Sequence, residues 1–171
     1  MKSHAHSHHT DHRGRDYLPL VALIAVAALA ATARGFSYEP ATSGLRWMHD
    51  FMGFFLVVFA LLKFFDLPGF ADGFQMYDLL AKRWRPYALV YPFIELALGL
   101  GFLAEWRPDI LYPATVAILV FGALGVIRAL AKGLDVKCAC MGNILKVPLS
   151  TVALTEDLGM AAMAAVMWLK M

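Results

Sequence analysis

Hydrophobic residues in this chain of 171 residues fall in long blocks, and polar residues rarely interrupt a block. Five blocks are expected to form helices, at about residues 17–33, 47–67, 87–103, 110–130 and 152–169. At a rise of 1.5 Å per residue, a helix of roughly 20 residues crosses the ~30 Å hydrocarbon layer of a bilayer. The helices of a water-soluble protein would each need a polar face, and polar residues at that spacing are mostly missing from these blocks. The pattern predicts an all-α integral membrane protein with five transmembrane helices.

The chain divides into a polar tail, residues 1–16, and one transmembrane domain, residues 17–171. No polar linker is long enough to separate a second domain. The tail has almost no apolar content, only Met1 and Ala5, so it is predicted to be disordered. Ala31-Thr32-Ala33 fits a signal-peptide cleavage site, although the preceding apolar run is longer than usual. The first block is therefore predicted to be a retained helix, with cleavage as the alternative.

Composition points to lipid as the main surroundings of the chain. Hydrophobic residues make up 60% of it, charged residues 16%, and the mean hydropathy is +0.62. A net charge of +2 is too small to suggest a nucleic-acid partner. The four tryptophans lie at block ends, where aromatic rings settle at the membrane interface. With them are Tyr17, Tyr87 and Tyr112.

The positive charges predict the orientation, because cytoplasmic loops are enriched in lysine and arginine. If the amino terminus is cytoplasmic, eleven of the 15 Lys and Arg residues fall on the cytoplasmic side. Only Arg34, Arg46, Arg107 and Lys170 fall on the other side. The tail and the loops 68–86 and 131–150 are therefore predicted to be cytoplasmic.

Cys138 and Cys140, the only cysteines, lie one residue apart just after the fourth block. The adjacent Lys137 favours the thiolate form. Two such thiolates can exchange electrons as a dithiol/disulfide pair, or they can bind a soft ion such as Cu(I). A disulfide across one intervening residue is strained and easily reduced, which suits electron transfer. The alternative is a pair of ordinary reduced cytosolic thiols.

The tail is also a candidate metal-binding segment. Its histidines are His4, His6, His8, His9 and His12. Neutral imidazoles at these spacings bind Zn(II), Cu(II) or Ni(II), and Met141 adds a soft ligand beside the cysteines. A copper-like transition metal is therefore the candidate cofactor. The alternatives are a solubilising tail or a cloning remnant.

Glu95 lies near the middle of the third block, where an ionisable side chain is costly and suggests function. It shares a helix face with Gly99, which predicts that it points toward other helices. No basic residue of another block is expected at the same depth, so Glu95 is predicted to be protonated or in contact with water. Its role is either a proton or ion relay or a hydrogen bond between helices. Lys63 is predicted to reach the inner surface or to pair with Asp66.

Three further parts of the sequence have more than one interpretation or an uncertain role. Glu156 and Asp157 are predicted to lie in the first turns of the last helix, where the helix dipole favours acids. A role beside the cysteines is the alternative. Residues 69–85 have apolar residues at helical spacing and predict a surface helix or a re-entrant shoulder against the bundle. His49 and Asp50 are expected near the outer end of the second helix, as an interfacial polar cluster.

With these residues in view, the chain resembles the MauE/DoxX-like redox-associated membrane proteins. The similarity covers about residues 47–169, from FMGFFLVVFALLKFFDLPGF through to CACMGNILKVPLSTVALTEDLGMAAMA. Its most specific part is the Cys-x-Cys-x-Gly element that contains Cys138 and Cys140. The resemblance implies a four-helix bundle, to which the first helix here would be an addition. It also implies a bacterial inner membrane, and either maturation of the disulfide-rich small subunit of methylamine dehydrogenase or a role beside heavy-metal systems.

Three functions are therefore carried forward. The first is a thiol-linked membrane protein that passes electrons or matures a partner through Cys138 and Cys140, with a thioredoxin-like partner. The second is transport or delivery of a heavy metal, with a metal-handling partner, in which the histidine-rich tail collects the ion. The third is an accessory subunit that only supports a complex. No familiar hydrolase, nucleotide-binding or zinc-protease motif is present.

Overall fold

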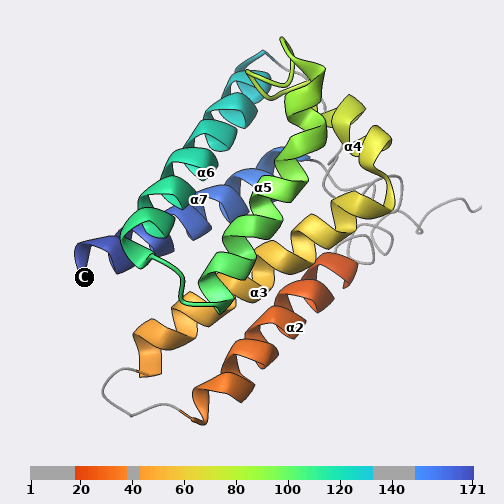
Figure 1. Ribbon diagram of the computed structural model, residues 1–171. Helices are drawn as coiled ribbons and strands as arrows, with labels where there is room; N and C mark the ends of the chain where they lie inside the picture. Colours follow the sequence, from red (N-terminus) through yellow and green to blue (C-terminus); the bar gives the residue numbers. More distant parts are fainter. Residues whose placement is uncertain (1–17, 38–42, 133–148) are drawn as a thin grey trace, which may run out of the picture.

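A computed structural model describes residues 18–37, 43–132 and 149–171, and within these ranges the chain is helical without strands. The long helices are α2 (Leu18–Gly35), α3 (Ser43–Phe65), α5 (Arg85–Leu103), α6 (Pro108–Ala131) and α7 (Leu149–Leu169). They alternate in direction along the bundle (Figure 1). The short helix α4 (Leu67–Phe74) follows α3 directly. The prediction of an all-α protein is confirmed.

Three helices have the length and apolar composition needed to cross a membrane: Gly44–Phe65 in α3, Arg85–Leu103 in α5 and Pro108–Ala131 in α6. A shorter apolar helix covers Leu20–Gly35 in α2. In a bilayer every backbone polar group must be bonded within the chain, and a helix does this within one segment. The chain is therefore an integral membrane protein, while the count of five spans stays a prediction.

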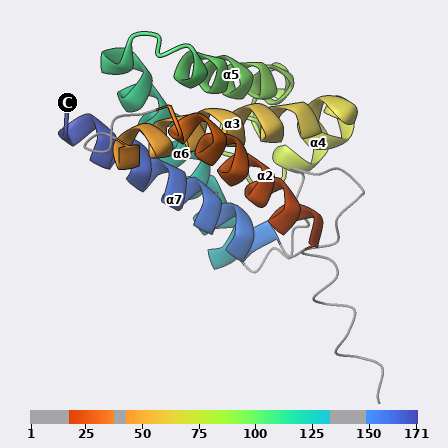
Figure 2. The same cartoon turned by 90° about the horizontal axis from the view of Figure 1, so that it is seen from below.

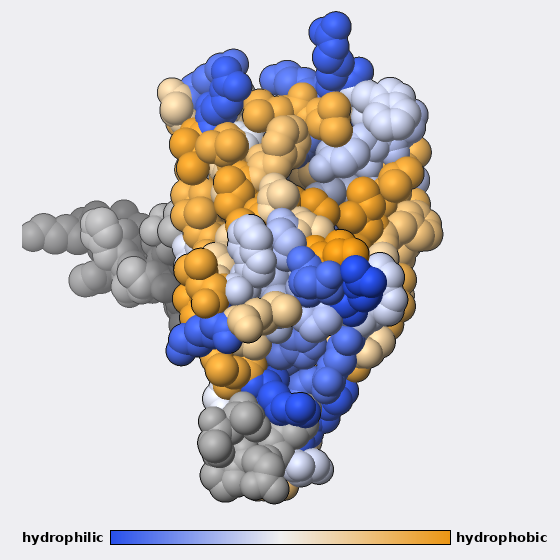
Figure 3. Space-filling model, turned by 60° about the vertical axis from the view of Figure 1, so that its left-hand side comes forward, coloured by the Kyte–Doolittle hydropathy of each residue, from blue (hydrophilic) through white to orange (hydrophobic). Residues whose placement is uncertain are grey.

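Helix α3 occupies the centre of the packing. It contacts α2 on one side and α5 on the other, while α6 packs chiefly against α7 (Figures 1 and 2). The crossing of α3 and α5 is close because glycine occupies both helices there: a Cβ on Gly99 would lie 3.0 Å from the carbonyl oxygen of Gly53. Small residues of this kind allow helix backbones to approach in membranes. Many large apolar side chains are exposed, and orange surface covers much of the face that Figure 3 shows, with hydrophilic surface in its lower central part.

Because the helices alternate in direction, their ends gather in two groups. We call the first group the α4 end: it holds α4, the last turns of α3 and α6, and the first turns of α5 and α7 (Figure 1). The described chain stops at Lys132 and resumes at Leu149, both at this end. The opposite end holds the short turn from α5 to α6. Which side of the membrane each end faces stays a prediction.

The segment after α3 differs from the expected surface helix. Helix α4 ends at Phe74, and residues 75–83 form turns. Phe70 and Phe74 are buried against Tyr91 of α5, whereas Leu80 and Trp84 are exposed. Asp66 begins α4 by accepting a hydrogen bond from the backbone N–H of Gly69. The shoulder that packs against the bundle is therefore the interpretation that the structure favours.

Candidate functional site

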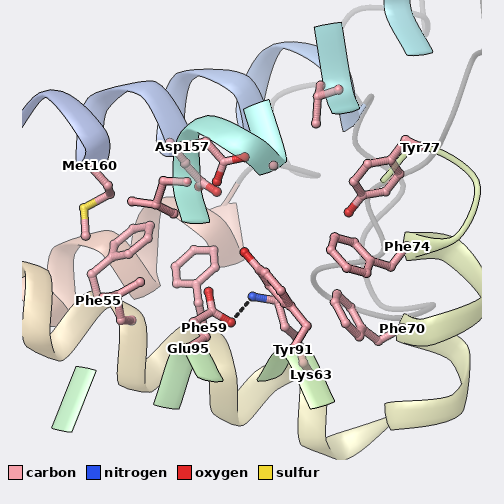
Figure 4. A pocket seen from close by; sticks show the side chains of 15 residues that line it. Phe55, Phe59, Lys63, Phe70, Phe74, Tyr77, Tyr91, Glu95, Asp157 and Met160 are labelled. Atoms are coloured by element: carbon pink, nitrogen blue, oxygen red, sulfur yellow. Dashed lines mark hydrogen bonds and ion pairs between the residues drawn. The ribbon is translucent and has the colours of Figure 1, made fainter. Parts of the chain in front are cut away.

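The α4 end of the bundle encloses a small cavity between α3, α5, α6 and α7 (Figure 4). Its volume is about 50 Å³, which is enough for a water molecule or a similarly small guest. Most of its wall is aromatic and aliphatic. One lysine and three carboxylic acids line it as well: Lys63, Glu95, Glu156 and Asp157. A cavity with this mixture of charges inside a membrane protein is the candidate site.

Lys63 of α3 and Glu95 of α5 form a buried ion pair in this cavity, drawn as a dashed line in Figure 4. Lys63 is 6% exposed and Glu95 8% exposed. The Lys63 ammonium also lies 5.6 Å from the ring centroids of both Phe70 and Tyr91, within the range of a cation–π interaction. Two sequence predictions were therefore wrong: Lys63 pairs with Glu95 and not with Asp66, and Glu95 does have a basic partner.

Lys63 reaches Glu95 because of its direction on the helix. It lies only two residues before the end of α3. Side chains on a helix lean toward the helix amino terminus, which for α3 is the opposite end of the bundle. The long lysine stem therefore carries its ammonium away from the surface and into the cavity. The sequence prediction placed the Lys63 charge too close to the surface, because it counted depth from the Cα position and not from the end of the side chain.

Glu156 and Asp157 contribute two more carboxylates to the cavity from α7. Helix α7 begins at Leu149 and has no acidic residue in its first turn, so the prediction of a helix-dipole role was wrong. Asp157 faces α6 at Gly122, where a Cβ would lie 3.4 Å from its Oδ2. Glu156 Oε1 is buried and has no hydrogen-bond partner within the described part of the chain. One ammonium and three carboxylates thus share one small volume.

Tyr77, in the turn after α4, closes the cavity at the α4 end. Tyr77 points toward it in Figure 4, and a Cβ on Gly125 of α6 would lie 3.0 Å from the Tyr77 carbonyl oxygen. Burial raises the pKa of the Tyr77 phenol well above its ordinary value, and the nearby Asp157 carboxylate adds to the shift. The phenol therefore stays neutral and able to donate a hydrogen bond.

Asp78 holds this turn in place. Its Oδ1 accepts hydrogen bonds from the backbone N–H groups of Leu80 (2.9 Å) and Ala81 (2.8 Å). The side chain is buried, and burial raises the pKa of its carboxyl group despite these two bonds. The side chain of Asp78 therefore stabilises the turn that contains Tyr77 through two hydrogen bonds.

A second polar group lies at the opposite end. His49 Nε2 donates to the carbonyl oxygen of Phe102 at 2.7 Å, so its Nδ1 accepts from the Tyr112 hydroxyl at 2.7 Å when the ring is neutral. Asp50 pairs with Arg34 at 3.5 Å. The expected polar cluster is present, but His49, Asp50 and Tyr112 are buried rather than interfacial. These contacts fix the ends of α2, α3, α5 and α6.

Several predicted site residues lie outside the described ranges. These are Cys138, Cys140, Met141, His4, His6, His8, His9 and His12. Among the described residues, no group of three or more His, Cys, Asp or Glu side chains is arranged to hold a metal ion. The thiol and metal roles stay predictions. Glu95 lies in one cavity with Glu156 and Asp157, although the sequence prediction considered Glu95 apart from these two acids.

Sequence reasoning missed the part that Lys63, Tyr77 and Tyr91 play in this site. A signal was available, because Phe55, Phe59 and Lys63 are spaced by four residues, as are Tyr91 and Glu95. Residues four apart share one helix face. A lysine that continues an aromatic face therefore points into the bundle with that face.

The described helices and the buried ion pair between two of them define a polytopic helical membrane protein. The family model of methylamine utilisation protein MauE matches residues 41–170, and the chain belongs to this family. The suspected family is thereby confirmed, and the matched range includes both cysteines. No curated protein and no solved structure matches the chain.

Proposed function

We propose that this membrane protein serves methylamine utilisation by thiol–disulfide exchange at Cys138 and Cys140. The observation that carries the proposal is the family match, which runs through the Cys-x-Cys element to the last helix. The position of the element along the chain supports it, because Lys132 and Leu149 on either side both lie at the α4 end. The charged cavity lies at that same end.

The exchange requires a second dithiol/disulfide pair, which a thioredoxin-like partner supplies. A thiolate of one pair attacks the disulfide of the other and forms a mixed disulfide. The second thiolate of the attacking pair then attacks the first sulfur of its own pair, forms a disulfide with it, and releases the other pair as two thiols. Two electrons pass, one disulfide is reduced and the other formed. A strained Cys138–Cys140 disulfide acts as the oxidant in this exchange, which suits the maturation of a disulfide-containing partner.

Replacing both cysteines by serine, Cys138→Ser with Cys140→Ser, is expected to abolish methylamine-dependent growth of a strain that relies on this protein. Serine keeps the side-chain size but removes the sulfur that exchange requires. The matched control is Ala139→Ser, which adds a hydroxyl between the cysteines and leaves both thiols. Thiol alkylation of whole membranes, read as a gel shift, reports the redox state of the pair.

Each single cysteine variant sharpens this test. One of them is expected to trap a mixed disulfide with the partner, because the resolving thiol is gone. The adduct should disappear on reduction and should not form in the double variant. Normal growth of the double variant would instead favour the accessory-subunit alternative.

A second candidate function is delivery of a soft transition metal, favoured by the five histidines within the first twelve residues. In this scheme the tail collects the ion and Cys138, Cys140 and Met141 receive it. Titration of the purified protein with Cu(I) and Zn(II) should show binding that weakens when residues 1–16 are removed and both cysteines are replaced by serine. Equal affinity in that variant would contradict the metal function.

A further inference from the structure

Among the described residues, the cavity at the α4 end is lined by more acidic than basic side chains. Its lining holds one ammonium, that of Lys63, and three carboxylates, those of Glu95, Glu156 and Asp157. Lys63 is engaged with Glu95 from α5. The two carboxylates from α7 are left on the other side of the cavity. Unbalanced charge in the interior of a membrane protein is costly, so these two carboxyl groups either hold protons or have a positive group beside them.

The cavity already shows which kind of positive group it accommodates. The Lys63 ammonium is held there by the Glu95 carboxylate and by the faces of two rings, Phe70 and Tyr91. A carboxylate together with aromatic faces is a common environment for organic ammonium ions in proteins. The rings of Phe55, Phe59 and Tyr77 extend this aromatic wall toward α7 (Figure 4).

An unused acceptor and free space lie beside the α7 carboxylates. Glu156 Oε1 is buried without a hydrogen-bond partner among the described residues, and a buried acceptor of this kind normally has one. Glycine at position 122 leaves room next to Asp157 Oδ2. The volume of about 50 Å³ admits only a very small guest. These carboxylates are not arranged as a metal-ligand group, whereas an ammonium ion needs only acceptors for its N–H groups.

We propose that this cavity binds a small ammonium cation, either ammonium itself or methylammonium. The cation donates hydrogen bonds to Glu156 and Asp157 and lies against the aromatic wall, next to the Lys63–Glu95 pair. The binding is separate from the thiol chemistry, so the double cysteine variant should bind the cation as the wild type does.

The test is calorimetric titration of the purified, detergent-solubilised protein at pH 7 with ammonium, methylammonium, potassium and tetramethylammonium chlorides. Saturable binding of the first two is expected. Potassium, which donates no hydrogen bond, should bind more weakly, and tetramethylammonium is too large for the cavity. Absence of binding would show that the carboxylates hold protons instead and would overturn the proposal. Equal binding of potassium would overturn it as well.

Variants locate the binding in the cavity. Glu156→Gln and Asp157→Asn are each expected to weaken methylammonium binding by about tenfold or more, because each removes a charged hydrogen-bond acceptor. The matched control is Asp109→Asn, an exposed acid of α6 that pairs with Arg107 away from the cavity. Unchanged affinity in both cavity variants would contradict the site.

Gly122→Ala provides a second measurement that does not alter charge. Its Cβ would lie 3.4 Å from Asp157 Oδ2, an ordinary contact that the fold can accept. The narrower cavity should lose affinity for methylammonium more than for ammonium. The same loss for both cations would contradict a guest placed between α6 and α7.

Discussion

Replacing Lys63 by methionine is expected to destabilise the protein by about 3–5 kcal/mol, the usual cost of leaving one buried charge without its partner. Methionine matches the length of the lysine stem but not its charge. Glu95, which is 8% exposed, would then lie in the bundle beside Glu156 and Asp157 without the nearest cation. Thermal unfolding in detergent, followed by circular dichroism, measures the effect. The control is Lys82→Met, at an exposed lysine in the turn before α5.

The double variant Lys63→Met with Glu95→Gln separates the ion pair from simple packing. Removing both charges should restore most of the lost stability, because a buried pair contributes little net energy compared with neutral groups of similar size. A double variant as unstable as Lys63→Met alone would show that the lysine acts through its packing against Phe70 and Tyr91. The interaction energy follows from the complete double-mutant cycle.

Gly99→Ala is expected to separate α3 from α5 and to lower stability by about 1–3 kcal/mol, as overpacking of a tight interface usually does. The new Cβ would lie 2.8 Å from the backbone nitrogen of Val57, and backbone atoms cannot move aside alone. At Gly159 of α7, a new Cβ would have no atom of another described part of the chain within 4 Å. There the higher helix propensity of alanine should leave stability equal or slightly raised.

Opposite signs for these two glycine variants would establish that the α3–α5 crossing depends on the missing side chain. Both variants change one hydrogen to a methyl group in a helix, so intrinsic helix propensity is the same in each comparison. Thermal unfolding and the yield of folded protein after solubilisation measure the difference. Equal unfolding temperatures at both positions would contradict the close crossing.

The aromatic wall shows how far helical spacing predicts a site. Phe55, Phe59 and Lys63 lie on one face by sequence alone, as do Tyr91, Glu95 and Gly99. Spacing therefore places each set on one helix and predicts that Glu95 points inward. It does not show that the two faces meet. That depends on how α3 and α5 rotate about their axes when they pack, and the close approach at Gly53 and Gly99 sets this rotation.

Acidic residues on the last helix illustrate a different limit. Glu156 and Asp157 were expected in its first turns, where a helix amino terminus stabilises acids. The helix begins earlier, at Leu149, so both acids lie deeper and reach the cavity. Helix boundaries are uncertain in sequence because apolar residues that flank a helix resemble those inside it. A shift of a few residues here changes the chemical interpretation of both side chains.

The sequence by itself determined the class of this protein. Long apolar blocks can meet the backbone hydrogen-bonding requirement of a bilayer only as helices, and the resemblance that led to the family depends on sequence alone. Tertiary structure decided which charges meet. Lys63 and Glu95 are 32 residues apart, and their contact depends on side-chain direction and helix rotation, which local pattern does not specify. The cavity formed with Glu156, Asp157 and Tyr77 therefore exists only in the packed bundle.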